Sequence, residues 1–569
     1  MTGWLAPAMP HLIVVPVLLP LLAAATMLLL GERRRRWLVL LNVTATLAGL
    51  GVAIALLAFV DTGAGPGAIG VYLPANWNVP FGIVLAVDHL SAMMLVVTGV
   101  VGLGAVLFAT ARWHRAGVHF HPLFQIQLMG LNGAFLTADL FNLFVFFEVL
   151  LTASYGLLLH GSGRKRVRAG LHYIAVNLLA SSLFLIGVAM IYGIVGTLNM
   201  ADIAQKIPAI PVDDRGLLYA GTAILGIAFL VKAAIWPLNF WLVPAYAAAS
   251  APVAALFVIL TKVGVYAVLR TWTLFLAPQD ESAVRFGADA LIYGGLVTLA
   301  LGTLGMAISQ NIRRLAAFAI VMSSGTLLAA IGFGNAALTG GALYYLVGST
   351  LAVSALFLLA ELIERSRQSE DTEVAIHDDE TDHLPFYMEM LEPVAGTNLD
   401  DEEEALIGKA IPAAMAFLGL GFIVCALLIA GLPPLAGFLA KFAMLSLLLD
   451  SANGGVSPEG AAMPTSAWAF LTLLIASSLL SMISLSRAGI RYFWAPPDRV
   501  VPRLRIIECV PVAGLLLACA LITVAADPVL RYATAAAEGL MQPARYIEAI
   551  MSAMPVPGPT RAGETPSTP

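Results

Sequence analysis

Residues 431–441 read GLPPLAGFLAK, and they interrupt an apolar stretch that runs from 410 to 449. Proline cannot donate a backbone hydrogen bond, and its ring clashes with the carbonyl four residues earlier, so Pro433 and Pro434 should break a helix here. A carbonyl freed in this way at membrane depth is tolerated only where it faces protein or water. The stretch therefore predicts a broken transmembrane helix, with Lys441 about two turns beyond the break.

A second apolar stretch, 216–243, is interrupted in the same way. Residues 232–237 read KAAIWP, and Pro237 should free the carbonyl of Ala233, as Pro434 should free that of Ala430. A pair of interrupted helices in corresponding halves of a chain is typical of inverted-repeat transporters. We therefore expect two inverted repeats of five helices each, helices 4–8 and helices 9–13, with helices 7 and 12 broken.

The composition is that of a polytopic membrane protein. Of the 569 residues 60% are hydrophobic and 11% charged, whereas a soluble domain carries about 25% charged residues. A helix needs about 20 apolar residues to span a membrane. Fourteen runs meet this need, which predicts an all-α membrane protein: 11–30, 37–60, 83–109, 122–138, 141–160, 170–195, 216–243, 249–272, 288–309, 315–335, 338–363, 410–449, 465–486 and 508–526.

This reading divides the chain into four parts. They are 1–110 with helices 1–3, 122–272 with the first repeat, 288–486 with the second repeat, and 487–569 with helix 14 and a C-terminal tail. The second repeat contains a loop at 364–409 that is strongly acidic, with fifteen acidic residues between 364 and 404. We expect that loop to be solvated or to serve as a docking surface.

The distribution of basic residues predicts the orientation in the membrane. If Arg33–Arg36 lie in the cytoplasm, the inside segments carry 20 Lys and Arg residues and the outside segments, in which we place Arg270, carry seven. Such a bias follows the positive-inside rule. We therefore expect a multi-pass protein of the plasma membrane, with both termini outside the cytoplasm.

Four titratable residues inside the apolar segments carry the strongest signal: Glu148, Lys232, Lys262 and Lys441. A charged side chain at the bilayer centre costs about 2.5–3.5 kcal/mol on insertion scales and by default marks an ion or proton pathway. An amine and a carboxylate that approach and separate can take up and release a proton. The alternative, a Glu–Lys pair that only fixes helix packing, does not account for four such groups, two of them beside helix breaks.

Other polar residues carry weaker signals. Asp139 sits at a helix boundary, where it could act as a helix cap or as a carboxylate for proton uptake. We expect His114, His119 and His121 to be solvated loop residues rather than metal ligands. The sequence predicts no metal site, no cofactor and no nucleic-acid partner.

Five ordered stretches carry a resemblance to a known family: TADLFNLFVFFE at 137–148, KAAIWPLNFW at 232–241, LTKVGVY at 260–266, NIRRLA at 311–316 with Ser323-Ser324-Gly325, and the stretch at 431–441. With them the chain resembles the antiporter-like subunits of Mrp-type cation/proton antiporters, respiratory complex I and membrane-bound hydrogenases. Asn239 and the Phe-rich run before Glu148 favour the D subunits of the Mrp-type multisubunit Na⁺/H⁺ antiporters. The resemblance implies that Glu148 and Lys232 interact in a polar axis that moves protons.

The eleventh helix departs from the family pattern. Gly348, Ser349 and Val353 stand where relatives commonly have titratable groups. Water held by nearby polar side chains is our hypothesis for the link from Lys262 to Lys441. Its members are Ser323, Ser324, Tyr345, Ser349, Thr350 and Ser354.

The sequence thus predicts a proton-translocating subunit of a multisubunit Na⁺/H⁺ antiporter, and not an enzyme in its own right. Its expected partners are the other subunits, protons, Na⁺ and the lipid bilayer. One alternative is a proton-pumping subunit of complex I or of a hydrogenase, and a second is a scaffold with a vestigial polar axis.

Overall fold

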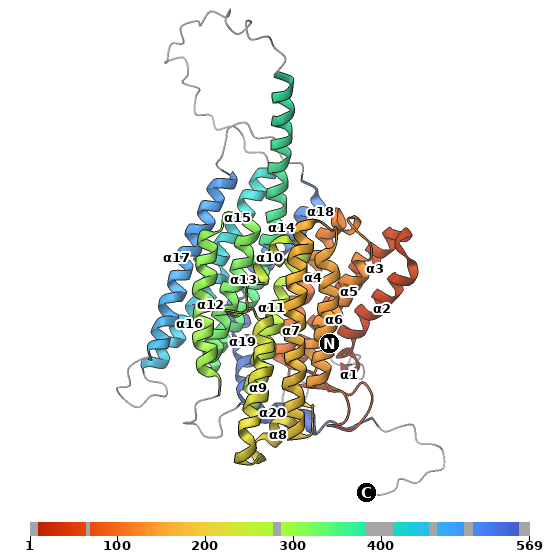
Figure 1. Cartoon of the computed structure of the whole chain (residues 1–569), viewed down its shortest axis with the longest axis vertical. Helices are drawn as coiled ribbons and strands as arrows, with labels where there is room; N and C mark the ends of the chain where they lie inside the picture. Colours follow the sequence, from red (N-terminus) through yellow and green to blue (C-terminus); the bar gives the residue numbers. More distant parts are fainter. Residues whose placement is uncertain are drawn as a thin grey trace, which may run out of the picture.

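A computed structural model describes residues 9–63, 69–276, 286–381, 413–453, 464–493 and 504–556 as a bundle of roughly parallel helices (Figure 1). The first half of the bundle contains α2 (Val15–Leu30), α3 (Arg35–Asp61), α4 (His89–Ala111), α5 (Phe120–Leu136), α6 (Leu140–Leu159), α7 (Arg164–Val195), α9 (Val212–Lys232), α10 (Leu242–Ala248) and α11 (Ala251–Phe275). The second half contains α12 (Ala288–Ile308), α13 (Ile312–Gly332), α14 (Ala336–Thr381), α15 (Ala413–Ala430), α16 (Ala436–Asn453), α17 (Thr465–Phe493) and α18 (Ile506–Val524).

The predicted fold class is confirmed. Among the described residues, twelve helices are long and apolar enough to cross a membrane. Helices 1 and 4 of the prediction correspond to α2 and α5, which are shorter, with 16 and 17 residues. Helix 7 corresponds to α9 and α10, and helix 12 to α15 and α16. The chain is an all-α polytopic membrane protein whose two five-helix repeats each contain a broken helix.

Burial separates the helices into a central and a peripheral group. Every residue of α11 is buried, and the membrane windows of α13 and α14 are nearly so. Only 28% of each window of α3 and α18 is buried, as expected for helices that face lipid. Lys262 lies on α11 and Ser323 on α13, so the central helices carry the middle of the predicted proton path.

Both helix breaks are held by a threonine of a neighbouring helix. At the first break, between α9 and α10, the backbone N–H of Trp236 donates to Thr298 Oγ1 of α12 at 2.8 Å. At the second, between α15 and α16, the N–H of Ala436 donates to Thr523 Oγ1 of α18 at 2.9 Å. These bonds satisfy backbone groups that the helices have released, as a membrane interior requires.

Several elements were not predicted from the sequence. A hairpin of β1 (Gly70–Tyr72) and β2 (Leu85–Val87) precedes α4, so the third membrane helix begins at His89 and not at residue 83. The remaining short elements are α1 (Met9–Leu12), α8 (Met200–Lys206) and three 3-10 turns. The segment expected as a C-terminal tail forms α19 (Ala526–Met541) and α20 (Pro543–Met551). The acidic loop was expected from residue 364, but α14 continues to Thr381, and the rest of the loop lies outside the described residues.

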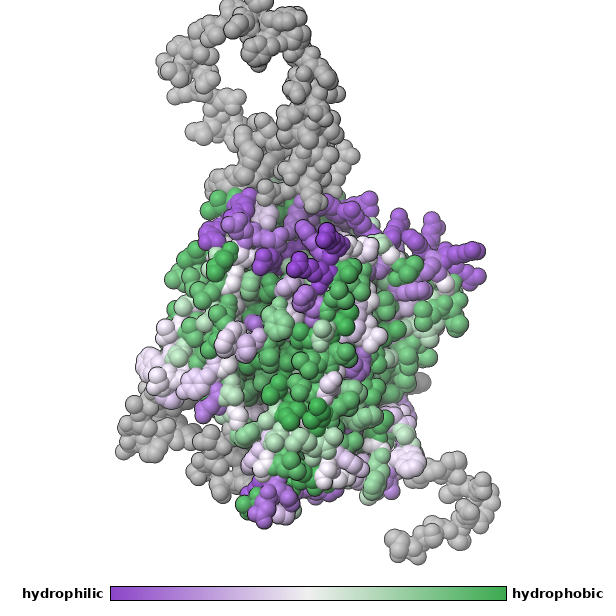
Figure 2. Space-filling model, viewed as in Figure 1, coloured by the Kyte–Doolittle hydropathy of each residue, from purple (hydrophilic) through white to green (hydrophobic). Residues whose placement is uncertain are grey.

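Loops that the positive-inside rule places on one side meet at one end of the bundle. Glu32 accepts a hydrogen bond from the N–H of His119, and Arg505 donates to the carbonyl of Ala111. Figure 2 shows hydrophilic residues along this upper edge and a broad hydrophobic band below it. We call this the basic end; that it faces the cytoplasm is still a prediction.

Candidate functional site

Lys262 occupies the centre of the bundle. Its side chain is 1% exposed, and Nζ donates a hydrogen bond to Ser323 Oγ on α13 at 2.7 Å. Ser323 Oγ in turn lies 3.1 Å from Ser349 Oγ on α14. The structure thus brings together three members of the predicted path, one from each central helix.

A small cavity continues from Ser349 toward the second helix break. Its volume is about 10 Å³, and Ser349, Tyr345, Ala436 and Gly437 are among its lining residues. A water needs roughly 10–15 Å³ of such volume. The cavity therefore lies at the lower limit for one water between Ser349 and the start of the helix that carries Lys441.

The other three residues of the hypothesised water link form no hydrogen bond with this row. Thr350 Oγ1 donates to the carbonyl of Leu346 in its own helix, and Ser354 Oγ donates to the carbonyl of Ala255. Ser324 Oγ is buried, without a hydrogen-bond partner among the described residues. Only Ser323, Ser349 and Tyr345 are therefore placed on a line from Lys262 to the break.

Lys441 is bound at the second break by a backbone carbonyl that proline releases from the helix. Its Nζ donates to the carbonyl of Ala430 at 3.1 Å and to Ser478 Oγ of α17 at 2.8 Å. The Ala430 carbonyl is one that Pro434 was expected to release. The freed acceptor thus stabilises the buried ammonium group.

Glu148 and Lys232 do not form an ion pair within 4 Å. Lys232 is 6% exposed, and its Nζ lies 5.3 Å from the centre of the Phe147 ring without a hydrogen-bond partner among the described residues. Glu148 is only half-buried and accepts a hydrogen bond from Ser181 on α7. In this conformation the two groups that the resemblance pairs are separate.

Two glycines allow the breaks to pack against their neighbours. A Cβ added to Gly264 of α11 would lie 2.4 Å from the backbone nitrogen of Ala233, directly after Lys232. A Cβ on Gly437 would lie 1.9 Å from the carbonyl oxygen of Leu428 on α15. Only glycine permits these approaches, which bring Lys232 against the helix of Lys262 and set the start of the Lys441 helix.

Asp139 serves as the N-cap of α6. Its carboxylate accepts a hydrogen bond from the N–H of Asn142 at 2.8 Å, a common way to satisfy the first turn of a helix. Burial raises the pKa of Asp139, although hydrogen bonds from the backbone oppose this. A role in proton uptake is still a prediction.

The histidines near the basic end are not all solvated, so that expectation was wrong for two of them. His114 and His121 are buried, and their ring centres lie 5.6 Å apart. His121 Nδ1 bonds to Asn42 on α3 at 2.8 Å, so helix packing covers it. His119 alone is exposed.

A buried carboxylate on α14 was also overlooked. Glu361 is 5% exposed, accepts a bond from Trp113 Nε1 at 2.6 Å, and faces the N–H of Ala251 at 3.3 Å. Ala251 is the first residue of α11, where a negative charge is favoured by the helix dipole. The signal was available, because Glu361 falls inside the predicted span 338–363.

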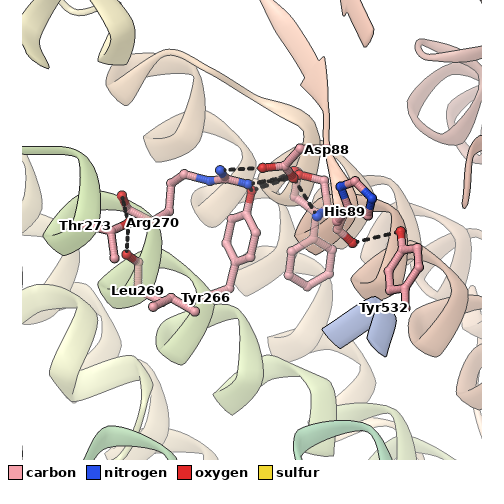
Figure 3. A network of polar contacts seen from close by, with 9 residues as sticks. Asp88, His89, Tyr266, Leu269, Arg270, Thr273 and Tyr532 are labelled. Atoms are coloured by element: carbon pink, nitrogen blue, oxygen red, sulfur yellow. Dashed lines mark hydrogen bonds and ion pairs between the residues drawn. The ribbon is translucent and has the colours of Figure 1, made fainter. Parts of the chain in front are cut away.

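An ion pair at the opposite end of α11 was missed as well (Figure 3). Arg270 Nη1 lies 2.6 Å from Asp88 Oδ2 and Nη2 lies 2.8 Å from Oδ1, a bidentate contact between α11 and the N-cap of α4. Arg270 is 5% exposed and is not in an outside loop, as the charge count assumed. Tyr532 of α19 donates to the neighbouring carbonyl of His89 at 3.1 Å, which ties the C-terminal helices to this site.

Replacing Asp88 by asparagine should lower the stability of the protein by about 3 kcal/mol, because Arg270 would stay buried without a counter-ion. Asparagine also caps helices, so the bond from the N–H of Ser91 is kept and the ion pair alone is removed. Thermal unfolding of the purified protein measures the loss. The double change Asp88→Asn with Arg270→Met should recover most of it, and an unchanged melting temperature in the single variant would contradict the assignment.

The stability difference between wild type and Asp88→Asn depends on pH. Burial opposes ionisation of Asp88, but the attraction of Arg270 and the hydrogen bonds outweigh it and hold the pKa of the carboxyl below its usual value. A carboxylate of this kind contributes its stability above its unfolded-state pKa of about 3.9 and loses it as the pH falls through the lowered value. The difference between wild type and Asp88→Asn should therefore be complete at neutral pH and shrink only in strong acid.

Comparison with known proteins places this geometry in a family. Residues 137–379 match the family described as NADH:quinone oxidoreductase/Mrp antiporter, TM. A relative from Rhizobium meliloti, named as the probable D subunit of a K⁺/H⁺ antiporter, is 50% identical over 97% of this chain and 99% of its own length. The D subunit of the Na⁺/H⁺ antiporter of Alkalihalophilus pseudofirmus is 30% identical over 95% of this chain and 100% of its own.

The fold is also shared with a solved assembly. A chain in the structure of the Mrp complex from Dietzia superposes with a TM-score of 0.78 at 25% identity, and the match covers 95% of this chain and 100% of that one. The likeness thus extends beyond the matched family segment to nearly the whole chain, including the helices outside the two repeats.

Proposed function

The chain belongs to the family of D subunits of multisubunit cation/proton antiporters, and on that premise we propose that it moves protons along the axis of Glu148, Lys232, Lys262 and Lys441. The observation that carries the proposal is the bonded row Lys262, Ser323 and Ser349, which crosses the centre of the bundle. Titratable side chains inside a membrane bundle cost free energy, and by default they mark an ion or proton pathway.

The separation of Glu148 from Lys232 supports a switch at one end of the axis. A buried ammonium without a hydrogen-bond partner has little to stabilise its charge, whereas a carboxylate in direct contact would stabilise it. Movement of the half-buried Glu148 between Ser181 and Lys232 would therefore change how tightly Lys232 holds its proton. The helix break next to Lys232 supplies a place where such a movement can occur.

We propose K⁺ as the exchanged cation, with Na⁺, the expectation from the sequence, as the alternative. The relative that is 50% identical bears a K⁺/H⁺ name, whereas the Na⁺/H⁺ name belongs to relatives at 30% and 32% identity. The axis itself offers three amines and one carboxylate, and Na⁺ and K⁺ prefer oxygen ligands. We therefore place the cation route in another subunit of the complex, with this subunit carrying the protons in the plasma membrane.

The proposal is tested with the purified complex in proteoliposomes that carry a pH-sensitive dye. Addition of K⁺ should dissipate an imposed pH gradient, and Na⁺ should do so more weakly. A complex that exchanges neither cation for protons, and that co-purifies with iron–sulfur and quinone-linked subunits, would favour the redox-driven alternative. A complex with the axis but without any proton flux would favour the scaffold.

A further inference from the structure

A cavity of about 1600 Å³ opens at the basic end of the bundle, apart from the proton axis. Its walls come from both repeats. The start of α7 and the first helix break belong to the first repeat, and the start of α13, Glu364 of α14 and Tyr492 of α17 belong to the second. Two segments about 150 residues apart in the sequence, 161–168 and 311–314, thus meet over one space.

The lining is strongly cationic. Its charged residues are Arg164, Lys165, Arg166, Arg168, Arg313, Arg314 and Glu364. The one carboxylate among them, Glu364, is already paired with Arg313 at 2.6 Å. Membrane topology alone explains basic loops, but it does not require two of them to converge on one cavity. The charge balance calls for an anionic occupant.

Two of the arginines are fixed by contacts within the protein, and the other three are exposed. Arg166 Nε donates to the carbonyl of Ala248 at 2.9 Å, and its guanidinium lies 4.9 Å from the centre of the Trp113 ring. Arg313 is fixed by Glu364. By contrast, the residues Arg164, Arg168 and Arg314 are exposed. These three are in place to contact a ligand.

The walls below the cations are apolar. Phe240 is 60% exposed although it belongs to a hydrophobic segment, and Val243, Pro244 and Phe318 also line the cavity. Figure 2 shows hydrophilic residues along the upper edge of the molecule, directly above hydrophobic surface. Pockets for small molecules measure about 300–1,000 Å³, so this one has room for a larger, amphipathic ligand.

We propose that this cavity binds an anionic diacyl phospholipid of the surrounding membrane. Its phosphate lies among Arg164, Arg168 and Arg314, because guanidinium groups bind phosphate oxygens through paired hydrogen bonds. Its acyl chains lie along Phe240 and Phe318. Basic pockets between transmembrane helices on the cytoplasmic side bind such headgroups. The lipid bridges the two repeats beside the first helix break, and this binding does not depend on the proposed proton path.

The test measures lipid binding to the delipidated, assembled complex by native mass spectrometry. Phosphatidylglycerol is the probe, with phosphatidylcholine and inorganic phosphate in separate arms. The triple change Arg164→Gln, Arg168→Gln and Arg314→Gln should weaken phosphatidylglycerol binding about 100-fold, at about fivefold per arginine. The matched control is Arg33→Gln, Arg34→Gln and Arg36→Gln, which removes the same exposed charge outside the cavity and should have no effect.

Several results would overturn the proposal. One is that the triple variant binds phosphatidylglycerol as well as the control variant does. Another is that the protein binds phosphatidylcholine as well as phosphatidylglycerol. A third is that inorganic phosphate displaces the lipid, which would identify a site for the free anion. A photo-cross-linker at Phe240 that captures a partner subunit instead of lipid would also overturn it. If the triple variant does not assemble, Arg314→Gln alone should weaken binding about fivefold, and unchanged binding in that variant would be contrary.

Discussion

Replacing Lys262 by alanine should reduce cation-driven proton transport on the order of 100-fold, the usual cost of removing a positioned proton donor or acceptor. Lys262 is 1% exposed, and its ammonium reaches Ser323, the first member of the row that leads toward Lys441. Alanine cannot carry a proton, and α11 contains no other lysine and no aspartate, glutamate or histidine. Proton flux in proteoliposomes measures the effect.

A second substitution at this position separates transport from packing. Lys262→Arg retains a positive charge and hydrogen-bond donors, but arginine stays protonated at all accessible pH values. It should therefore also block transport. Lys206→Ala is the control, since Lys206 is 47% exposed and lies outside the proposed axis, and it should transport normally. Wild-type flux in Lys262→Arg would mean that Lys262 only fixes the helix packing.

Replacing Gly437 by alanine should destabilise the protein by at least about 4 kcal/mol, which is at the exceptional end for one substitution. The added methyl group would lie 1.9 Å from the carbonyl oxygen of Leu428, a backbone atom that cannot move without opening the second break. Lys441 would then lose its place at the carbonyl of Ala430. Thermal unfolding and the amount of complex in the membrane measure the loss.

Gly419→Ala is the matched control, because Gly419 lies in the helix before the same break and an added Cβ there meets no atom within 4 Å. Alanine has the higher helix propensity, so this variant should be as stable as wild type or up to about 1 kcal/mol more stable. If Gly437→Ala unfolds at the wild-type temperature, the close packing assigned to the break is wrong.

The membrane helices and their breaks could be predicted because their causes are local. A run of apolar residues is enough to indicate a span, and Pro237 and Pro434 act on their own helices. The elements that were missed have weak local signals: the strands of the hairpin have three residues each, and α19 and α20 have low mean hydropathy. Their positions depend on contacts with the rest of the bundle.

The polar residues of the site show the same limit. The four titratable residues of the proposed axis were recognised because each stands out within its own segment. Asp88 and Arg270 are 182 residues apart, and only the tertiary structure joins them. The burial of His121 depends on Asn42 of another helix. Gly264 and Gly437 were read only as parts of motifs, because the backbone atoms that they approach are not evident from the sequence.

The central claim, that protons pass along the buried Glu–Lys axis, is tested most directly at its first pair. Proton flux driven by K⁺ or Na⁺ should be measured in proteoliposomes containing the assembled complex with Glu148→Ala or Lys232→Ala, beside wild type. The account predicts that each change removes most of the flux while the complex stays assembled. Near-normal exchange in both variants would contradict it.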